Sequence, residues 1–303
     1  MTGDRQHPAA AAVAAKGWLG AHKWLLLRRA SQALIIALFL AGPLAGIWIV
    51  TGNLTSSLTL GLLPLTDPYV QLQSLAAGHV PGLDAAIGAA IVLVAYALVG
   101  GRVYCAWVCP VNPVTDGAQA LRRRLGLGKG WQPRRATRLW MLAMTLVVAA
   151  LTGTIAWELV NPVSLLHRGL IFGIGAGWMI ILAVFLLDAF VARHGWCGHL
   201  CPVGAFYGLL GTRSLLRVKA ARRQDCDDCM DCFAICPEPQ VIAPALKGAG
   251  RGVGPVILAR DCTNCGRCID VCSKDVFRFA LRFDNAAEGP SATQEIERHR
   301  AAA

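Results

Sequence analysis

Residues 226–237 read CDDCMDCFAICP, and residues 262–273 read CTNCGRCIDVCS. Both segments have the spacing Cys-x2-Cys-x2-Cys-x3-Cys, which is typical of bacterial proteins that hold two [4Fe–4S] clusters. Three cysteines on such a tight loop can face three irons of one cubane, and the fourth, one helical turn on, ligates the other cluster. A structural zinc ribbon would not need the third cysteine of each run. The two segments therefore predict two [4Fe–4S] clusters.

The ligand sets are predicted to cross between the two segments. One cluster is expected to use Cys226, Cys229, Cys232 and Cys272. The other is expected to use Cys262, Cys265, Cys268 and Cys236. The surrounding residues 216–284 are polar with short β-like patches such as VFRFALRF, which predicts a small α+β domain like a bacterial 2[4Fe–4S] ferredoxin.

The rest of the chain is too apolar for an ordinary soluble domain. Of 303 residues, 55% are hydrophobic and 16% are charged, so membrane spans are expected. Four apolar runs of about the length that crosses a bilayer cover residues 30–50, 83–101, 139–160 and 170–192. The fold class is therefore predicted as mainly α, with a four-helix transmembrane bundle of two hairpin repeats before the ferredoxin-like domain.

Basic residues predict the orientation of these spans. Lys and Arg gather before the first run, between the second and third, and after the fourth, whereas residues 53–82 contain none. By the positive-inside rule, both termini and the second connection are cytoplasmic. The net charge of +11 is explained in this way without nucleic acid, and the location is predicted as the bacterial inner membrane, multi-pass.

Four domains follow from these patterns. Residues 1–29 are expected to form a poorly ordered cytoplasmic tail, and residues 30–215 the four-span membrane domain. Residues 216–284 form the cytoplasmic ferredoxin-type domain, and residues 285–303 a tail without fixed structure.

The remaining four cysteines lie in two similar segments at the membrane edge. CAWVCPVNPVTDG (105–117) follows the second run and CGHLCPVGAFYG (197–208) follows the fourth. Cysteines four residues apart share one helical face, so Cys105 could act with Cys109 and Cys197 with Cys201. Three interpretations stay open: convergent metal or cluster ligation, thiol redox or maturation chemistry, and packing alone. His194 and His199 are most simply interfacial hydrogen-bonding residues.

A membrane redox protein of this kind commonly exchanges electrons with quinol, whose oxidation needs proton acceptors. The segment PLTDPYVQLQSLAAGH (64–79) could dip back toward the bilayer and place Asp67 and His79 near a quinol headgroup. Other polar or interfacial residues on the face opposite the clusters are Gln71, Asp84, Glu158, His167, Trp48 and Trp157. Asp188, inside the fourth run, is costly to bury alone and could pair with Arg193. The sequence contains no Cys-x-x-Cys-His haem motif and no Rossmann or phosphate-loop fingerprint.

The order of these motifs resembles the NapH family of membrane quinol-dehydrogenase components in bacterial periplasmic nitrate reductase systems. GNLTSSL, PLTDP, HGWCGH-CPVGA-YG, CMDCF-CPEP and DC-CGRC-DVCS-DVF all look like that family. The resemblance implies electron transfer from quinol, with a periplasmic ferredoxin-type partner (NapG-like), to a membrane multihaem cytochrome or directly to periplasmic nitrate reductase. It carries over the eight tail cysteines as ligands and leaves the catalytic residues of the quinol site unknown.

A second class of function stays open. Related membrane polyferredoxins supply electrons for the maturation or maintenance of periplasmic metalloenzymes and share the same motif order. This alternative fits the predicted topology, because the clusters face the cytoplasm while the nitrate reductase is periplasmic.

Overall fold

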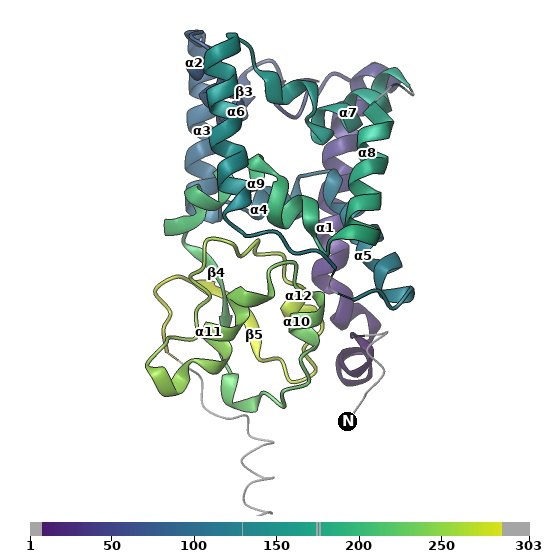
Figure 1. Ribbon diagram of the computed structural model, residues 1–303, viewed down its shortest axis with the longest axis vertical. Coiled ribbons are helices and arrows are strands. Elements are labelled where there is room, and N and C mark those ends of the chain that lie inside the picture. The colour runs from purple at the N-terminus through teal and green to yellow at the C-terminus, as the bar shows by residue number, and fades with distance from the viewer. Residues whose placement is uncertain (1–7, 129, 174, 176, 287–303) are drawn as a thin grey trace, which may run out of the picture.

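The computed structural model describes residues 8–128, 130–173, 175 and 177–286. A helical bundle stands on a smaller unit that contains a two-stranded sheet (Figure 1). The helices of the bundle are α1 (Ala10–Ala45), α2 (Pro68–Ala76), α3 (Leu83–Val99), α4 (Val103–Trp107), α5 (Val111–Arg124), α6 (Thr137–Thr152), α7 (Pro162–Phe172), α8 (Gly177–Leu186) and α9 (Pro202–Leu210). Shorter turns are the 3-10 helix η1 (Ala156–Leu159) and the π-helices η2 (Leu187–Val191) and η3 (Trp196–Leu200).

Each of the four apolar runs contains a helix, but their bounds differ from the predicted ones. The third ends at Thr152, because Gly153 takes the left-handed conformation. The fourth is divided, since Leu170 belongs to α7 and the next helix begins only at Gly177. Within the described residues, α1 alone is long and apolar enough to cross a membrane; α3, α6 and the 177–191 segment are shorter. The four-span bundle therefore stays a prediction.

The bundle has two sides, and each combines helices from both halves of the chain (Figure 1). On one side α6 packs against α2 and α9, and α2 packs against α3. On the other side α8 packs against α5 and α7, and α1 also contacts α7. Each side thus contains two helices from each half of the chain.

Two short helices begin with the same local geometry and extend the internal repeat beyond the cysteine motifs. Asp67 precedes Pro68 at the start of α2, and its side chain accepts the Tyr69 N–H. Asn161 precedes Pro162 at the start of α7, and its side chain accepts the Val163 N–H. Both are N-caps followed by a proline at the first helical position, where the missing N–H costs nothing.

A small antiparallel sheet lines the space between the two sides. It consists of β1 (Val50–Gly52), β2 (Ser56–Thr59) and β3 (Leu63–Thr66), in the order β1-β2-β3. Gly88 of α3 allows β3 to lie close, because a Cβ there would stand 3.0 Å from the backbone of Pro64 and Thr66. The chain leaves β3 directly into Asp67, the N-cap of α2.

The smaller unit pairs β4 (Leu216–Ala220) with β5 (Phe277–Leu281) in antiparallel register, so the strand expected in VFRFALRF is present. Its helices are α10 (Asp231–Ile235), α11 (Ile242–Lys247) and α12 (Arg267–Asp270), with 3-10 turns η4 (Gly211–Arg213), η5 (Arg223–Asp225), η6 (Pro239–Val241) and η7 (Ala249–Arg251). Val218, Ile242, Ile257 and Val276 are the centre of its core.

The N-terminal segment differs from the poorly ordered tail that composition predicted. Helix α1 begins at Ala10 and its first half packs against α12. The backbone N–H groups of Trp24 and Leu25 donate to the two oxygens of Asp270, at 3.0 and 2.9 Å. This long-range anchor, which composition cannot reveal, explains why the segment is helical. Residues 1–7 and 287–303, which include most of the expected C-terminal tail, lie outside the described residues.

Candidate iron–sulfur sites

The eight cysteines of the small unit surround two separate pockets. One has an empty volume of about 370 Å³ and is lined by Cys226, Cys229, Cys232 and Cys272. The other has an empty volume of about 350 Å³ and is lined by Cys236, Cys262, Cys265 and Cys268. The structure thus brings together the same two sets of four that the spacing predicted, including the exchange of the last cysteine of each run.

The two pockets are neighbours within one core. Cys268 of the second set interacts electrostatically with Cys232 of the first. At the two tight turns, Met230 and Gly266 have positive φ angles of 66° and 73°. A residue with a Cβ would not fit at position 266, because that atom would stand 2.6 Å from the Trp24 side chain of α1. The loop can therefore hold its cysteines inward and lie against the bundle at once.

The four cysteines at the membrane edge also line one pocket. Cys105, Cys109, Cys197 and Cys201 surround an empty volume of about 420 Å³, whose walls include Tyr104, Trp157 and Trp196. No disulfide joins them. Two cysteines come from each half of the chain, so the pocket exists only where the halves meet.

The two motifs fold in the same way around this pocket. The Cys109 N–H donates to the Tyr104 carbonyl at 3.0 Å, and the Cys201 N–H donates to the Trp196 carbonyl at 2.9 Å. Both bonds span five residues, which is the wide turn of a π-helix, a feature common at functional sites. Pro110, the N-cap of α5, and Pro202, the first residue of α9, follow directly.

Arg102 connects this pocket to the small unit. Its guanidinium donates to the Cys197 carbonyl at 3.1 Å, to Glu238 Oε1 at 2.7 Å and to the Asp261 carbonyl at 2.8 Å. Glu238 lines the pocket of Cys236, and Asp261 immediately precedes Cys262. Burial alone would raise the pKa of Glu238, but Arg102, Arg138 and Arg135 lower it below its ordinary value.

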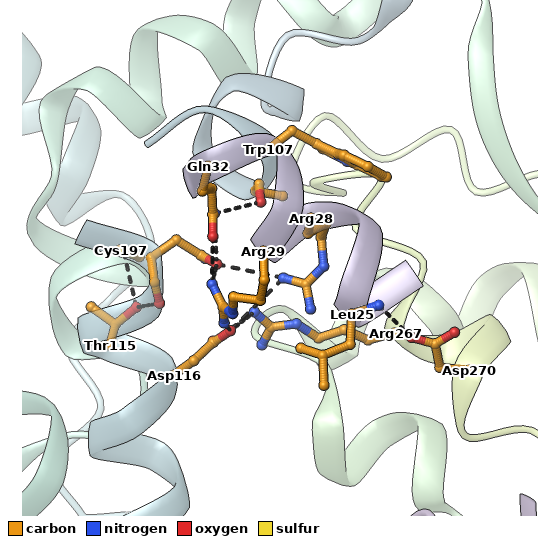
Figure 2. A network of polar contacts seen from close by, with 12 residues as sticks. Leu25, Arg28, Arg29, Gln32, Trp107, Thr115, Asp116, Cys197, Arg267 and Asp270 are labelled. Carbon is orange, nitrogen blue, oxygen red and sulfur yellow. Dashed lines mark hydrogen bonds and ion pairs between the residues drawn. The ribbon is translucent and has the colours of Figure 1, made fainter. Parts of the chain in front are cut away.

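A second polar network joins α1, α5 and α12, and Figure 2 shows it around Asp116. Arg267 donates to both oxygens of Asp116, at 2.6 and 2.8 Å. Arg29 also pairs with this carboxylate, and Arg28 lies 3.8 Å from it. Burial alone would raise the pKa of Asp116, but the guanidinium groups of Arg267, Arg29 and Arg28 lower it overall. Thr115, one residue before, lies beside Cys197, with 3.9 Å between Oγ1 and Sγ.

A larger pocket of the bundle lies beside the cysteine pocket. Its empty volume is about 900 Å³, partly open to the surroundings, and the lining residues come from α1, the three-stranded sheet, α3, α4 and α9. Asp67 is its buried acid, 8% exposed, and accepts bonds from the Tyr207 hydroxyl and the Tyr69 N–H, both at 3.0 Å. Tyr104 lines this pocket and the cysteine pocket alike, so the two share a wall.

The other polar residues singled out in the sequence do not line the Asp67 pocket. His79 is exposed at the far end of α2, where it bonds the Gly153 carbonyl at 3.0 Å. Glu158 accepts bonds from Asn161 and Ser164 at the start of α7. Residues that do not line the Asp67 pocket are Gln71, Asp84, His167, Trp48 and Trp157. Of the predicted pair, Asp67 therefore lines this pocket and His79 does not.

Asp188 and Arg193, which the sequence allowed to pair, have other partners. Asp188 is fully buried and accepts the Trp196 N–H at 2.9 Å, which fixes the turn just before Cys197. Arg193 instead donates to the carbonyls of Phe233, Ala234 and Cys236 in the small unit. His194 and His199 are buried, and neither lines the cysteine pocket.

Sequence reasoning missed four residues that organise these sites. Arg102 was visible only as part of a basic loop, and Asp116 and Glu238 lie within the quoted segments CAWVCPVNPVTDG and CMDCF-CPEP without a role assigned to them. Tyr207 stands 140 positions from Asp67. The available signal for it was the internal repeat, since Tyr207 and Thr115 hold the same position after Cys201 and Cys109.

Comparisons with known proteins agree with this division of the chain. A family model described as "4Fe-4S binding domain" matches twice, at residues 82–128 and 174–222, and a "4Fe-4S dicluster domain" matches residues 225–276. The first model covers both Cys-x3-Cys-Pro motifs, which supports the internal repeat. No solved structure matches the chain.

Three similar proteins cover nearly the whole chain. "Methylamine utilization ferredoxin-type protein MauN" of Methylorubrum extorquens is 58% identical over 89% of this chain and 93% of its own length. The protein of the same name from Paracoccus denitrificans is 59% identical over 89% of this chain and 95% of its own. "Ferredoxin-type protein NapH" of Escherichia coli is 51% identical over 90% of this chain and 94% of its own.

Proposed function

The chain belongs to the family of ferredoxin-type proteins that includes NapH and MauN, and on that premise we propose that it is a membrane iron–sulfur subunit that oxidises quinol. The resemblance to the NapH family is confirmed by the comparisons, and an iron–sulfur electron-transfer role follows from it. Quinol as the electron donor and nitrate reduction as the destination are the finer parts of the proposal.

The two pockets of the small unit fit two [4Fe–4S] clusters. Each is lined by four cysteines, which is the ligand number of a cubane. We assign Cys226, Cys229, Cys232 and Cys272 to one cluster and Cys236, Cys262, Cys265 and Cys268 to the other. When bound, each cluster would accept or donate one electron at a time.

The buried carboxylate of Asp67 in a large apolar pocket is the observation that carries the quinol assignment. Oxidation of one quinol breaks two O–H bonds and releases two electrons and two protons. Asp67 can accept one proton, while the Tyr207 hydroxyl and the Tyr69 N–H hold its orientation. The second proton leaves through the open side of the pocket. A pocket of this size with few polar groups suits a small organic headgroup.

The electrons are proposed to reach the small unit through the shared wall at Tyr104 and the contacts of Arg102. The distribution of basic residues favours a cytoplasmic position for this unit. The arginines that bind this unit, among them Arg102 and Arg138, are ones that the positive-inside rule assigns to the cytoplasm. Both termini, by the same argument, are cytoplasmic, and the protein is a multi-pass protein of the bacterial inner membrane.

The partners proposed are a periplasmic ferredoxin-type subunit like NapG and, beyond it, a multihaem cytochrome or the periplasmic nitrate reductase. A second candidate function is electron supply for maturation or maintenance of a periplasmic metalloenzyme. It is favoured by the docking of the small unit at the basic end of the bundle, away from a periplasmic acceptor. Similarity to MauN proteins, named for methylamine utilization, also broadens the choice of acceptor beyond nitrate reductase.

Reduction of the protein by quinol tests the proposal. The full chain, purified without oxygen and placed in lipid nanodiscs, is mixed with ubiquinol or menaquinol analogues and followed by EPR. Signals of reduced clusters are expected with at least one quinol. Clusters that respond to dithionite and to neither quinol would reject quinol oxidation and favour the maintenance function.

A further inference from the structure

All twelve cysteines of the chain line one of three pockets, and each pocket has four of them. The empty volumes, about 370, 350 and 420 Å³, are similar. Two of these pockets fit the clusters of the dicluster domain. We propose that Cys105, Cys109, Cys197 and Cys201 together ligate a third [4Fe–4S] cluster, shared between the two halves of the membrane domain.

Neither half can hold such a cluster alone. The family model described as "4Fe-4S binding domain" matches residues 82–128 and 174–222 separately, yet each segment has only two cysteines. A cubane needs four ligands. In the structure, the two cysteines of each half line the same pocket, so four ligands are present where the halves meet.

The four thiols are mutual neighbours. Every one of the six pairs that they form has an electrostatic interaction in the structure. Among the described residues, no group of three or more His, Cys, Asp or Glu side chains is placed to hold a metal ion, and this includes both sets of the dicluster domain. In all three sets the cysteines surround a volume instead of meeting at a point. That arrangement suits a cubane and disfavours a tetrahedral zinc site, where four sulfurs lie about 2.3 Å from one atom.

Backbone N–H groups face two of the four sulfurs at symmetric positions. The N–H groups of Val111 and Asn112 point to the Cys109 sulfur at the start of α5. Those of Val203 and Gly204 point to the Cys201 sulfur at the start of α9. Hydrogen bonds to ligand sulfurs are one of the means by which proteins tune iron–sulfur clusters. Both motifs provide them in the same way, because each proline stands at the start of a helix, directly after the second cysteine of its motif.

The charged groups near the pocket and its aromatic walls also suit a bound cluster. Ligation removes one proton from each of the four thiols and leaves a cluster with net negative charge. Arg102 and Arg138 lie close enough to Cys105 to interact with it electrostatically, and they offset this charge. The indole rings of Trp157 and Trp196 are stacked, with centroids 6.3 Å apart, and shield the pocket.

The position gives this cluster a role that rests on the proposed function. Its pocket shares Tyr104 with the Asp67 pocket, and Arg102 joins it to Glu238 beside the set of Cys236. A cluster here therefore stands between the proposed quinol pocket and the dicluster domain. The ligand assignment itself does not depend on quinol.

Counting the clusters tests the inference without any activity measurement. The full chain is purified without oxygen, reconstituted with iron and sulfide, and analysed by native mass spectrometry and by iron and sulfide determination. Three cubanes, about 12 iron atoms per chain at four per cluster, are expected. Two cubanes after reconstitution to saturation would overturn the proposal.

Serine variants identify the ligands. The quadruple variant C105S/C109S/C197S/C201S is expected to lose about one third of the iron while the EPR signals of the dicluster domain persist, which shows that the protein has folded. Cys226→Ser should instead perturb an EPR signal of the dicluster domain and leave the third cluster unchanged. Thr115→Val, which changes the neighbour of Cys197 without removing a thiol, should keep all three. Unchanged iron in the quadruple variant would assign the third cluster elsewhere and reject the site.

If the clusters number three but quinol reduces none of them, the proposed function fails while this site stands. If quinol reduces a protein with only two cubanes, the site fails and the proposed function stands.

Discussion

Arg102 and Glu238 form a buried ion pair, with 2.7 Å between Nη1 and Oε1, that joins the membrane-edge motif to the dicluster unit. Each residue is only 2% exposed. Glu238 also accepts a bond from Arg138 at 2.9 Å and pairs with Arg135. A single carboxylate, in the loop that follows Cys236, thus binds three guanidinium groups. They belong to Arg102 just before α4, to Arg135 in the loop before α6, and to Arg138 in α6.

Loss of this carboxylate should weaken the junction strongly. Glu238→Ala leaves the buried Arg102 without its carboxylate partner and Arg138 with Asp261 alone, and removing one partner of a buried ion pair typically costs about 3–5 kcal/mol. The thermal midpoint of the purified protein, followed by the bleaching of the cluster absorbance, should fall by several degrees. Asp275→Asn removes the partner of Lys16 in an exposed pair and should change little. Equal effects of the two variants would contradict the role of Glu238.

Asp116 predicts how the second network responds to pH. Its pKa is lowered overall by Arg267, Arg29 and Arg28, so its contribution is full above the ordinary carboxyl value of 3.8 and disappears as pH falls through the lowered value. The difference in thermal midpoint between the wild type and Asp116→Asn should therefore stay constant from about pH 8 to about pH 5. A difference that shrinks between pH 7 and 6 would show that these guanidinium groups do not hold Asp116 ionised.

Asp67 predicts the rate of quinol oxidation. Asp67→Asn cannot accept a proton, and general base groups contribute about 10²–10⁴-fold to rates, so reduction of the clusters by quinol should slow by roughly this factor. Tyr207→Phe keeps the carboxylate and loses one hydrogen bond, so its effect should be smaller. Stopped-flow absorbance of the clusters measures both, and Asp84→Asn, an exposed acid at the start of α3, is the control. Wild-type rates in Asp67→Asn would remove Asp67 from the mechanism.

Much of the dicluster unit could be predicted from the sequence because its chemistry is local. The spacing of Cys226, Cys229 and Cys232 already requires a tight loop, and the crossed position of Cys272 follows from it. The helix bounds in the bundle were harder. A hydropathy pattern cannot separate α7 from α8, since both are apolar and the break at Gly173 depends on backbone conformation.

Contacts between distant residues account for what the sequence did not reveal. The pairs Tyr207–Asp67 and Arg102–Glu238 join residues 140 and 136 positions apart. Such pairs depend on how the two halves dock, which no local pattern encodes. The convergence of the four Cys-x3-Cys-Pro cysteines was one of three interpretations from sequence, and only the arrangement of α4 and η3 around one pocket favours it.

The arrangement of α4 and α9 depends on the close approach of the Gly101 backbone to the backbone of Tyr207 and Gly211. A Cβ at Gly101 would stand 1.7 Å from the Tyr207 carbonyl oxygen and 2.4 Å from the Gly211 nitrogen, and backbone atoms cannot rotate away. Gly101→Ala should therefore push α4 and α9 apart, at a cost of about 3 kcal/mol or more. Because these elements hold Cys105 and Cys201, iron at the membrane-edge site should decrease before the dicluster signals do. Gly82→Ala is the matched control, since a Cβ at Gly82 meets nothing within 4 Å. If both alanine variants keep full iron content and the wild-type thermal midpoint, the close packing of α4 on α9 does not hold the site together.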